Sequence, residues 1–186
     1  MSAQDPDRTG QPVLIRSYRD GDYLALIELY TMGRLAGDID HHEIELDLDF
    51  IDETYCRRPQ NHLWLAEADG SPIGMIGVLG MGDAIAQVRW LRVDAAWLDT
   101  DVAGRLLAVA IDHCRRYGYL RIVIMTSVRA RRAIPVLHCL GFRSSRCVTL
   151  DDHQMLEFSL DLPRHPDPDD RRPHHIEGGD HLSGFG

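Results

Sequence analysis

The feature that most constrains this chain is an amphipathic helical pattern followed at once by a strand-like apolar run. From about Thr100 to Tyr117 the apolar residues recur at the spacing of one helical face, and they are Val102, Leu106, Leu107, Val109, Ala110 and Ile111. Gly118 ends this pattern, and residues 119–126 are almost continuously apolar, which is typical of a strand buried on both faces. Such a strand belongs inside a sheet that helices cover on both sides.

Shorter patterns on either side supply the rest of such a sheet. Two apolar runs joined by the turn at residues 68–72, which contains Asp-Gly, predict a β-hairpin. The expected strands are Val13–Arg16, His62–Glu67, Ile73–Leu79, Ala86–Val93, Tyr119–Thr126, Phe142–Leu150 and Gln154–Leu160, and the further helices are Tyr23–Met32 and Ala130–Cys139. This order predicts an α/β (α+β) fold with a central mixed sheet and helices on both faces.

One stretch, residues 38–53, has no single interpretation. It holds eight carboxylates and no arginine. Residues 43–50 alternate with the period of a strand, whereas residues 50–57 are better described by a helix. So acidic a segment either attracts a cationic molecule or forms a solvated surface.

Length and composition indicate one domain. With 186 residues the chain has room for a single core, which we expect over residues 12–161, between a flexible start at 1–11 and a disordered tail at 162–186. The net charge of −9 argues against a nucleic-acid partner. We find neither an apolar leader nor a run long enough to span a bilayer, so we expect no membrane association and a cytoplasmic location.

The second half of the domain carries recognisable pieces in a fixed order. They are Leu91-Arg92-Val93-Asp94, Val102-Ala103 with Leu106-Leu107, residues 113–119, Met125-Thr126-Ser127, and Ala133-Ile134 followed by Leu140-Gly141-Phe142. In this order and spacing, and with the hairpin upstream, they resemble the GNAT family of N-acetyltransferases over about 150 residues. The resemblance implies the GNAT acyl-CoA N-acyltransferase fold, acetyl-CoA as co-substrate and an amine acceptor, either a small molecule or a protein.

The resemblance also implies where acetyl-CoA binds. In the family, backbone N–H groups at a helix start cradle the pyrophosphate, after a motif of Gln or Arg, two residues, Gly, one residue, then Gly or Ala. The same register here is Leu98-Asp99-Thr100-Asp101-Val102-Ala103, in which Ala103 alone matches. The implied cofactor-binding residues are Leu91, Arg92, Val93, Asp99, Thr100, Asp101, Val102, Ala103, Gly104, Arg129 and Arg132.

Two carboxylates and three arginines in this region have alternative interpretations. Asp99 and Asp101 either repel the phosphates, at about 4 kcal/mol for each contact at ~4 Å and an effective dielectric of ~20, or cap the helix start. Arg129, Arg131 and Arg132 stand where the helix dipole disfavours positive charge, so they either bind an anion or form a solvated helix end.

The implied catalytic positions carry residues without acid–base chemistry. The tyrosine that protonates the departing thiolate in the family corresponds to Leu137, and a nearby asparagine corresponds to Ala130. Glu67 is a candidate base, with pairing to an arginine as the alternative, and His138 is a candidate acid. We expect no metal site. The rival hypothesis is a catalytically inactive GNAT-fold module that binds a ligand or a protein, and a homodimer is compatible with either.

Overall fold

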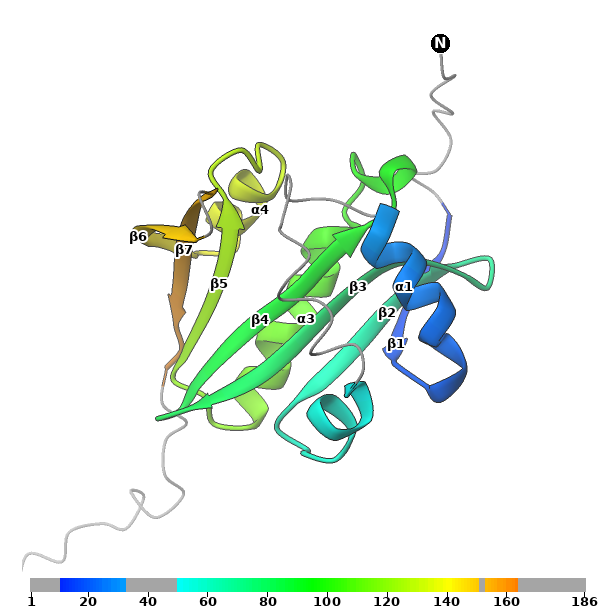
Figure 1. Cartoon of the computed structure of the whole chain (residues 1–186), viewed down its shortest axis with the longest axis horizontal. Helices are drawn as coiled ribbons and strands as arrows, with labels where there is room; N and C mark the ends of the chain where they lie inside the picture. Colours follow the sequence, from blue (N-terminus) through cyan, green and yellow to red (C-terminus); the bar gives the residue numbers. More distant parts are fainter. Residues whose placement is uncertain (1–10, 33–49, 151–152, 164–186) are drawn as a thin grey trace, which may run out of the picture.

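A computed structural model describes residues 11–32, 50–150 and 153–163 of the chain. Its centre is a seven-stranded sheet with the order β1-β2-β3-β4-β5-β7-β6 (Figure 1). The strands are β1 (Val13–Ser17), β2 (His62–Ala68), β3 (Ser71–Gly82), β4 (Ile85–Val93), β5 (Arg121–Ser127), β6 (Arg143–Leu150) and β7 (His153–Asp161). The expected strands and the mixed sheet are confirmed.

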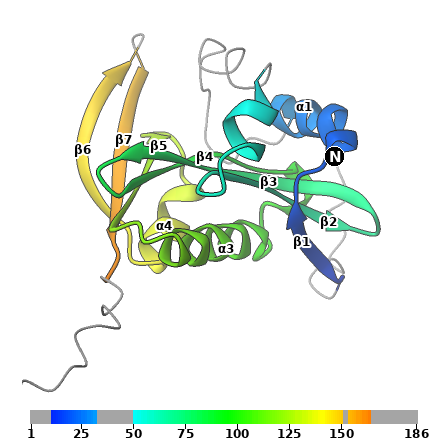
Figure 2. The same cartoon turned by 90° about the horizontal axis from the view of Figure 1, so that it is seen from below.

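Helices cover both faces of this sheet (Figure 2). On one side lie α1 (Tyr23–Met32) and the short π-helix η4 (Asp52–Cys56), and on the other lie α3 (Val102–Arg116) and α4 (Ala133–Cys139). The single turns η2 (Asp20–Asp22) and η5 (Ala95–Trp97) precede α1 and α3. Residues 51–56, within the stretch 50–57, are therefore helical as the sequence suggested, while residues 43–49 lie outside the described part.

Each face has its own apolar core. On the α3 face the predicted helical stripe is buried, with Val102, Leu106, Leu107 and Ala110 completely inaccessible, together with Ile122 and Ile124 of β5. On the α1 face Leu26 and Leu29 pack with Tyr55, Leu65, Met75 and Trp90. Burial in β5 alternates, because Ile122 and Ile124 lie in the α3-face core whereas Val123 and Met125 are only half-buried. The expectation of a strand buried on both faces is therefore wrong for the second face.

Glycines in β3 allow the flanking elements to approach the sheet closely. A Cβ on Gly74 would lie 3.0 Å from Leu106 of α3, and one on Gly77 would lie 3.1 Å from the ring of Tyr55 in η4. Gly74 and Gly77 lie on opposite faces of β3. Both helical layers can therefore approach the backbone of this strand closely.

Several boundaries differ from the expectations, among them β3, which runs from Ser71 to Gly82 rather than from Ile73 to Leu79, and β5, which begins at Arg121 rather than Tyr119. α3 begins at Val102 rather than near Thr100, and α4 begins at Ala133 rather than Ala130, because turns precede both helices. Leu162, which we assigned to the tail, is buried and donates its N–H to the carbonyl of Leu120 at 2.8 Å. The remainder of the tail and the first ten residues lie outside the described part.

Candidate functional site

Strands β4 and β5 are paired over only part of their length. They are parallel neighbours from Ile85↔Arg121 to Val88↔Ile124, yet β4 continues to Val93 and β5 continues to Ser127. The strands diverge beyond the last pair (Figure 1). Along the diverging ends, the backbone of β4 therefore has no β5 partner within the described residues, so its polar groups can bind an extended ligand.

A bulge in β4 begins where the pairing ends. On the β3 side, Gly77 pairs with Arg89 but Met75 pairs with Arg92, so β4 has one extra residue. Trp90 has φ of 55°, which is unusual for a bulky residue and costs on the order of 1–3 kcal/mol. Burial of its indole and its contact with Tyr55, at 5.2 Å between ring centroids, offset this cost. The bulge thus redirects the backbone at the point of divergence.

The start of α3 offers backbone donors next to the diverging strands. Asp101, at the N-cap position, makes no side-chain capping hydrogen bond, and the Thr100 hydroxyl accepts only a long bond, 3.4 Å, from the N–H of Val102. For the N–H groups of Ala103 and Gly104 no acceptor occurs among the described residues, as the first turn of a helix allows. A Cβ on Gly104 would meet nothing within 4 Å, so the space beside this residue is open.

The charged residues at this helix start neither cap it nor point inward. The Asp99 side chain is 75% exposed, and its carboxylate lies 3.5 Å from the guanidinium of Arg132, which precedes α4. Asp101 is exposed as well. Asp101 therefore stands at the N-cap without a capping hydrogen bond from its side chain, and water screens both carboxylates far more than the 4 kcal/mol estimate assumed. Arg129 and Arg131 are exposed, in keeping with the solvated alternative, although an anion can still reach them.

Three predicted cofactor residues lie along β4, with different orientations. The side chains of Leu91 and Val93 are buried in the α3-face core, so only their backbone can contact a ligand. Arg92 is also buried, but its guanidinium lies over the ring of Tyr30 on the α1 face, 5.2 Å from the centroid, and donates to the carbonyl of Leu91. The Arg92 side chain therefore lies on the face opposite α3, and only its backbone remains a candidate contact for the cofactor.

At the end of β5 the structure reveals a residue that the sequence analysis missed as a functional candidate. Thr126 is 3% exposed, and its hydroxyl has no hydrogen-bond partner among the described residues. It lies two positions beyond Ile124, the last residue paired with β4. A threonine inside an apolar strand gives a signal in the sequence, but only the structure shows that nothing satisfies it.

Neither predicted acid–base residue lies at the diverging strands. Glu67 stands at the far end of β2 and forms an ion pair with Arg16, as the alternative interpretation held. His138 directs Nδ1 at the carbonyl of Phe142, 3.3 Å away, and its ring packs edge-on against Phe158. Leu137 and Ala130, at the implied tyrosine and asparagine positions, are both buried. The structure thus gives no support to either catalytic assignment.

Glu157 on β7, the strand next to β5, is also held in an ion pair. Glu157 of β7 pairs in register with Met125 and accepts bonds of 2.7 and 3.0 Å from the guanidinium of Arg146 on β6. Hydrogen bonding by Arg146 lowers the pKa of Glu157, so the group is ionised at neutral pH. Its role here is to hold the β6–β7 hairpin together.

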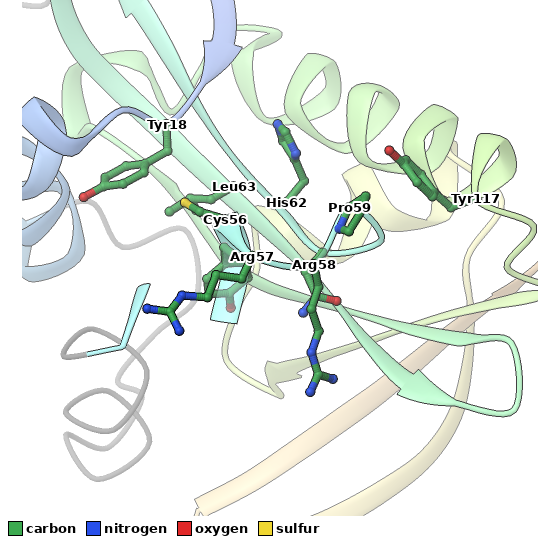
Figure 3. Close-up of a pocket in the computed structure, with 10 residues that line it drawn as sticks. Tyr18, Cys56, Arg57, Arg58, Pro59, His62, Leu63 and Tyr117 are labelled. Atoms are coloured by element: carbon green, nitrogen blue, oxygen red, sulfur yellow. The ribbon is translucent and has the colours of Figure 1, made fainter. Parts of the chain in front are cut away.

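A separate pocket of about 410 Å³ opens at the edge of β2, beyond the end of β1. Tyr18 and Tyr117 stand on opposite sides of it (Figure 3). Tyr117 directly follows α3, a helix of 15 residues and therefore about 22 Å long, so this pocket lies at the opposite end of α3 from the open helix start. None of its lining residues belongs to β4 or β5.

Three lining side chains of this pocket have pKa values that favour their uncharged forms. Burial, followed by the charge of Asp52, raises the pKa of Tyr18 to about 12 and raises that of Cys56 as well. Burial lowers the pKa of His62. The pocket therefore presents hydroxyl, thiol and imidazole groups together with the exposed guanidinium groups of Arg57 and Arg58, which do not amount to an acyl-transfer site.

The described residues contain neither a candidate metal-binding cluster nor a candidate membrane-spanning helix. No group of three or more His, Cys, Asp or Glu side chains within them could hold a metal ion. No helix among them has the length and apolar character to span a bilayer.

Comparison with known proteins identifies the architecture. The chain is 25% identical over 118 residues to the probable N-acetyltransferase camello of Xenopus tropicalis, a match that covers 61% of this chain and 54% of that protein. It is 22% identical over 131 residues to N-acetyltransferase 8 of Rattus norvegicus, covering 64% of this chain and 59% of that protein. The chain thus spans little more than half the length of these relatives.

Solved structures share the fold. A GNAT-family acetyltransferase from Staphylococcus aureus Mu50 superposes with a TM-score of 0.71 at 20% identity, covering 82% of this chain and all of the other. The ribosomal-protein-S18-alanine N-acetyltransferase of Escherichia coli superposes with a TM-score of 0.66 at 13% identity, covering 84% and 98%. The model of the acetyltransferase (GNAT) family matches residues 18–142, which include both helical layers and the diverging strands, and the chain belongs to this family.

Proposed function

We propose that this chain transfers an acetyl group from acetyl-CoA to an amine acceptor by direct attack of the amine on the thioester. The observation that carries the proposal is the divergence of β4 and β5 beside a helix start whose first backbone donors have no acceptor among the described residues. GNAT membership supports acyl transfer in general. The acetyl donor, the amine acceptor and the direct attack are the parts that we propose.

The shape of the helix start fits the diphosphate of a CoA ester. Gly104 leaves open the space that a side chain would fill, and the N–H groups of Ala103 and Gly104 are available to phosphate oxygens. Asp101 replaces the family glycine without backbone strain, because its φ of −82° suits any residue. The fit is therefore good in geometry and hindered mainly by the charge of Asp101.

The charges near the helix start are closer to balance than the sequence suggests. Arg132 offsets Asp99, and Arg129 and Arg131 add two positive charges close by in the sequence. An incoming phosphate would compete with the Asp99 carboxylate for Arg132, and an exposed pair of this kind contributes little. We expect binding weaker than the family motif would give, but not abolished.

Acetyl-CoA, when bound, supplies the activated thioester, and the residues of the chain mainly hold the reacting groups in position. The backbone of β4 from Arg89 to Val93 would align the donor along the open strand edge. Because Leu137 cannot donate a proton and Glu67 is held by Arg16, proton transfer falls to water or to the acceptor itself. General acid–base catalysis contributes about 10² to 10⁴ in rate, so turnover should be slow but measurable.

For the acceptor we propose a cationic amine, either a small molecule or a protein. The acidic stretch 38–53 belongs to the segment that joins α1 to η4, and its last two carboxylates, Asp52 and Glu53, are exposed on η4. Both α1 and η4 lie on the face opposite α3 (Figure 2). An acceptor approaching from that face would meet a negative potential that attracts polyamines or basic peptides.

The test is calorimetric titration of acetyl-CoA into the full chain and into a Thr100→Asp variant. The new carboxylate would occupy the first N–H groups of α3 and repel the phosphates. Thr149→Asp, the same change at an exposed position of β6, is the matched control. We expect micromolar binding by the wild type and the control, and its loss in Thr100→Asp. If millimolar acetyl-CoA produces no heat with the wild type, the proposal is wrong.

One observation favours a second function. Because Leu137 and Ala130 are buried in place of the implied tyrosine and asparagine, the chain could bind a CoA ester without using it. Binding with no turnover across a panel of amines, polyamines and basic peptides would support this non-catalytic module.

A further inference from the structure

The hydroxyl of Thr126 is a buried polar group at the end of β5, beyond the last pair with β4. Thr126 is 3% exposed, and its Oγ1 has no hydrogen-bond partner among the described residues. Native proteins seldom leave a buried hydroxyl unsatisfied, because it loses its bonds to water and gains none. An unsatisfied group of this kind calls for a partner that the protein chain does not provide.

The position of Thr126 limits what that partner can be. On β5 it shares a face with Ile122 and Ile124, which belong to the α3-face core, and on its β7 side it is paired with Leu156. On its β4 side the pairing has ended two residues earlier. A partner can therefore approach from between the separated strands.

The residues that follow do not satisfy the hydroxyl either. The Ser127 hydroxyl accepts the N–H of Arg129 at 3.2 Å, and the N–H of Ala130 donates to the carbonyl of Ser127. A buried water would need about three polar partners, and the turn already uses these groups for its own bonds. A ligand is the simpler way to satisfy Thr126.

Chemistry favours a neutral acceptor. Thr126 shares its face of β5 with the apolar Ile122 and Ile124 and offers one uncharged donor, whereas a buried phosphate needs several donors or a cation. The N–H groups in the first turn of α3 that lack an acceptor among the described residues, and the exposed arginines before α4, would meet that need for phosphates. The pantetheine arm of a CoA ester carries uncharged amide and thioester carbonyls, which a single hydroxyl can satisfy.

We propose that the Thr126 hydroxyl donates a hydrogen bond to the pantetheine arm of the bound acyl donor and positions it between β4 and β5. This inference rests on the proposed function, since it requires that a CoA ester binds. It predicts that Thr126 contributes to affinity for the arm and not to affinity for the phosphates.

The experiment compares three variants with the wild type. Thr126→Val keeps the shape and removes the hydroxyl, Thr126→Ser keeps the hydroxyl, and Thr149→Val makes the first change at an exposed site on β6. Each protein is titrated with acetyl-CoA and with adenosine 3′,5′-bisphosphate, which lacks the arm. Thermal unfolding without ligand is measured in parallel.

We expect Thr126→Val to bind acetyl-CoA about 3- to 10-fold more weakly, as one lost hydrogen bond implies. Its affinity for the bisphosphate should not change, and Thr126→Ser should bind acetyl-CoA within about threefold of the wild type. Without ligand, Thr126→Val should unfold at the same temperature as the wild type or a higher one, because the unsatisfied hydroxyl is gone.

Each contrary result has a distinct meaning. Equal binding of acetyl-CoA by Thr126→Val and the wild type overturns the role of Thr126 and leaves the proposed function intact. Equal losses for both ligands overturn its assignment to the arm. A lower unfolding temperature for ligand-free Thr126→Val shows that the hydroxyl is satisfied by the protein or by water, which also overturns it. If the wild type fails to bind acetyl-CoA, the proposed function fails and this inference fails with it.

Discussion

Replacing Glu67 by glutamine separates a structural role for this residue from a catalytic one. Arg16 holds Asp22 through two hydrogen bonds, of 2.6 and 2.8 Å, and holds Glu67 with its second terminal nitrogen. The three side chains are only 13–16% exposed, so water screens the pairs incompletely. Glu67 therefore ties β2 to β1 and to the turn before α1.

The magnitude follows from these contacts. A hydrogen bond between charged groups contributes about 1.5–3 kcal/mol, but glutamine keeps an oxygen acceptor and Arg16 keeps Asp22. We expect Glu67→Gln to lower the free energy of unfolding by about 1–2 kcal/mol, with turnover unchanged. Urea unfolding at pH 7 measures the first quantity. A double-mutant cycle with Arg16→Met should give a coupling energy of about 1–2 kcal/mol.

A catalytic base would behave in the opposite way. If Glu67→Gln unfolds like the wild type but loses about 100-fold or more in turnover, the carboxylate abstracts a proton and our interpretation is wrong. Low pH offers an independent check on the same cluster. Hydrogen bonding by Arg16 holds the pKa of Asp22 below its usual 3.8. The stabilisation is thus present above that value and lost as the pH falls through the lower folded-state pKa, a loss that Arg16→Met should abolish.

Three further predictions concern other parts of the structure. Burial lowers the pKa of His62 and of His113 below the usual 6.5. As the pH falls through 6.5, these histidines take up protons more readily in the unfolded chain than in the folded one, so the free energy of unfolding should be lower at pH 5.5 than at pH 7.5, as urea unfolding would measure. Gly77→Ala should cost about 1–3 kcal/mol and shift tryptophan fluorescence, because its Cβ would lie 3.1 Å from the Tyr55 ring that packs on the Trp90 indole. Asp101→Asn should tighten acetyl-CoA binding by less than about tenfold in calorimetry, because the exposed charge that it removes is screened.

Matched variants make these results interpretable. His113→Gln should reduce the loss of stability between pH 7.5 and 5.5, and an unchanged loss would assign it to other groups. Gly21→Ala is the control for Gly77, since a Cβ there meets nothing within 4 Å and should cost little. If the two alanine variants are equally stable, close packing of Tyr55 on β3 is not what requires glycine. Weaker binding by Asp101→Asn would mean that the carboxylate helps the site rather than hinders it.

The sequence by itself determined the layers of the fold. The helical stripe of residues 102–111 and the continuous apolar run of residues 119–126 report local periodicity and burial, which are properties of single segments. They were sufficient to predict a sheet covered on both faces. The substitutions at Leu137 and Asp101 were also visible in the sequence, since they require only a register.

Only the tertiary structure decided what individual polar groups do. The alternative roles of Glu67 depended on whether an arginine lay within reach, and the ion pair of Asp99 with Arg132 was among neither of its two predicted roles. Arg16 and Arg132 come from distant parts of the chain. The bulge at Trp90 and the unsatisfied hydroxyl of Thr126 likewise arise from how strands pair and where pairing stops. Periodicity fixes which face of an element is buried, but hydrogen bonds and ion pairs depend on distances of a few ångströms between segments, and only packing of the whole chain sets those distances.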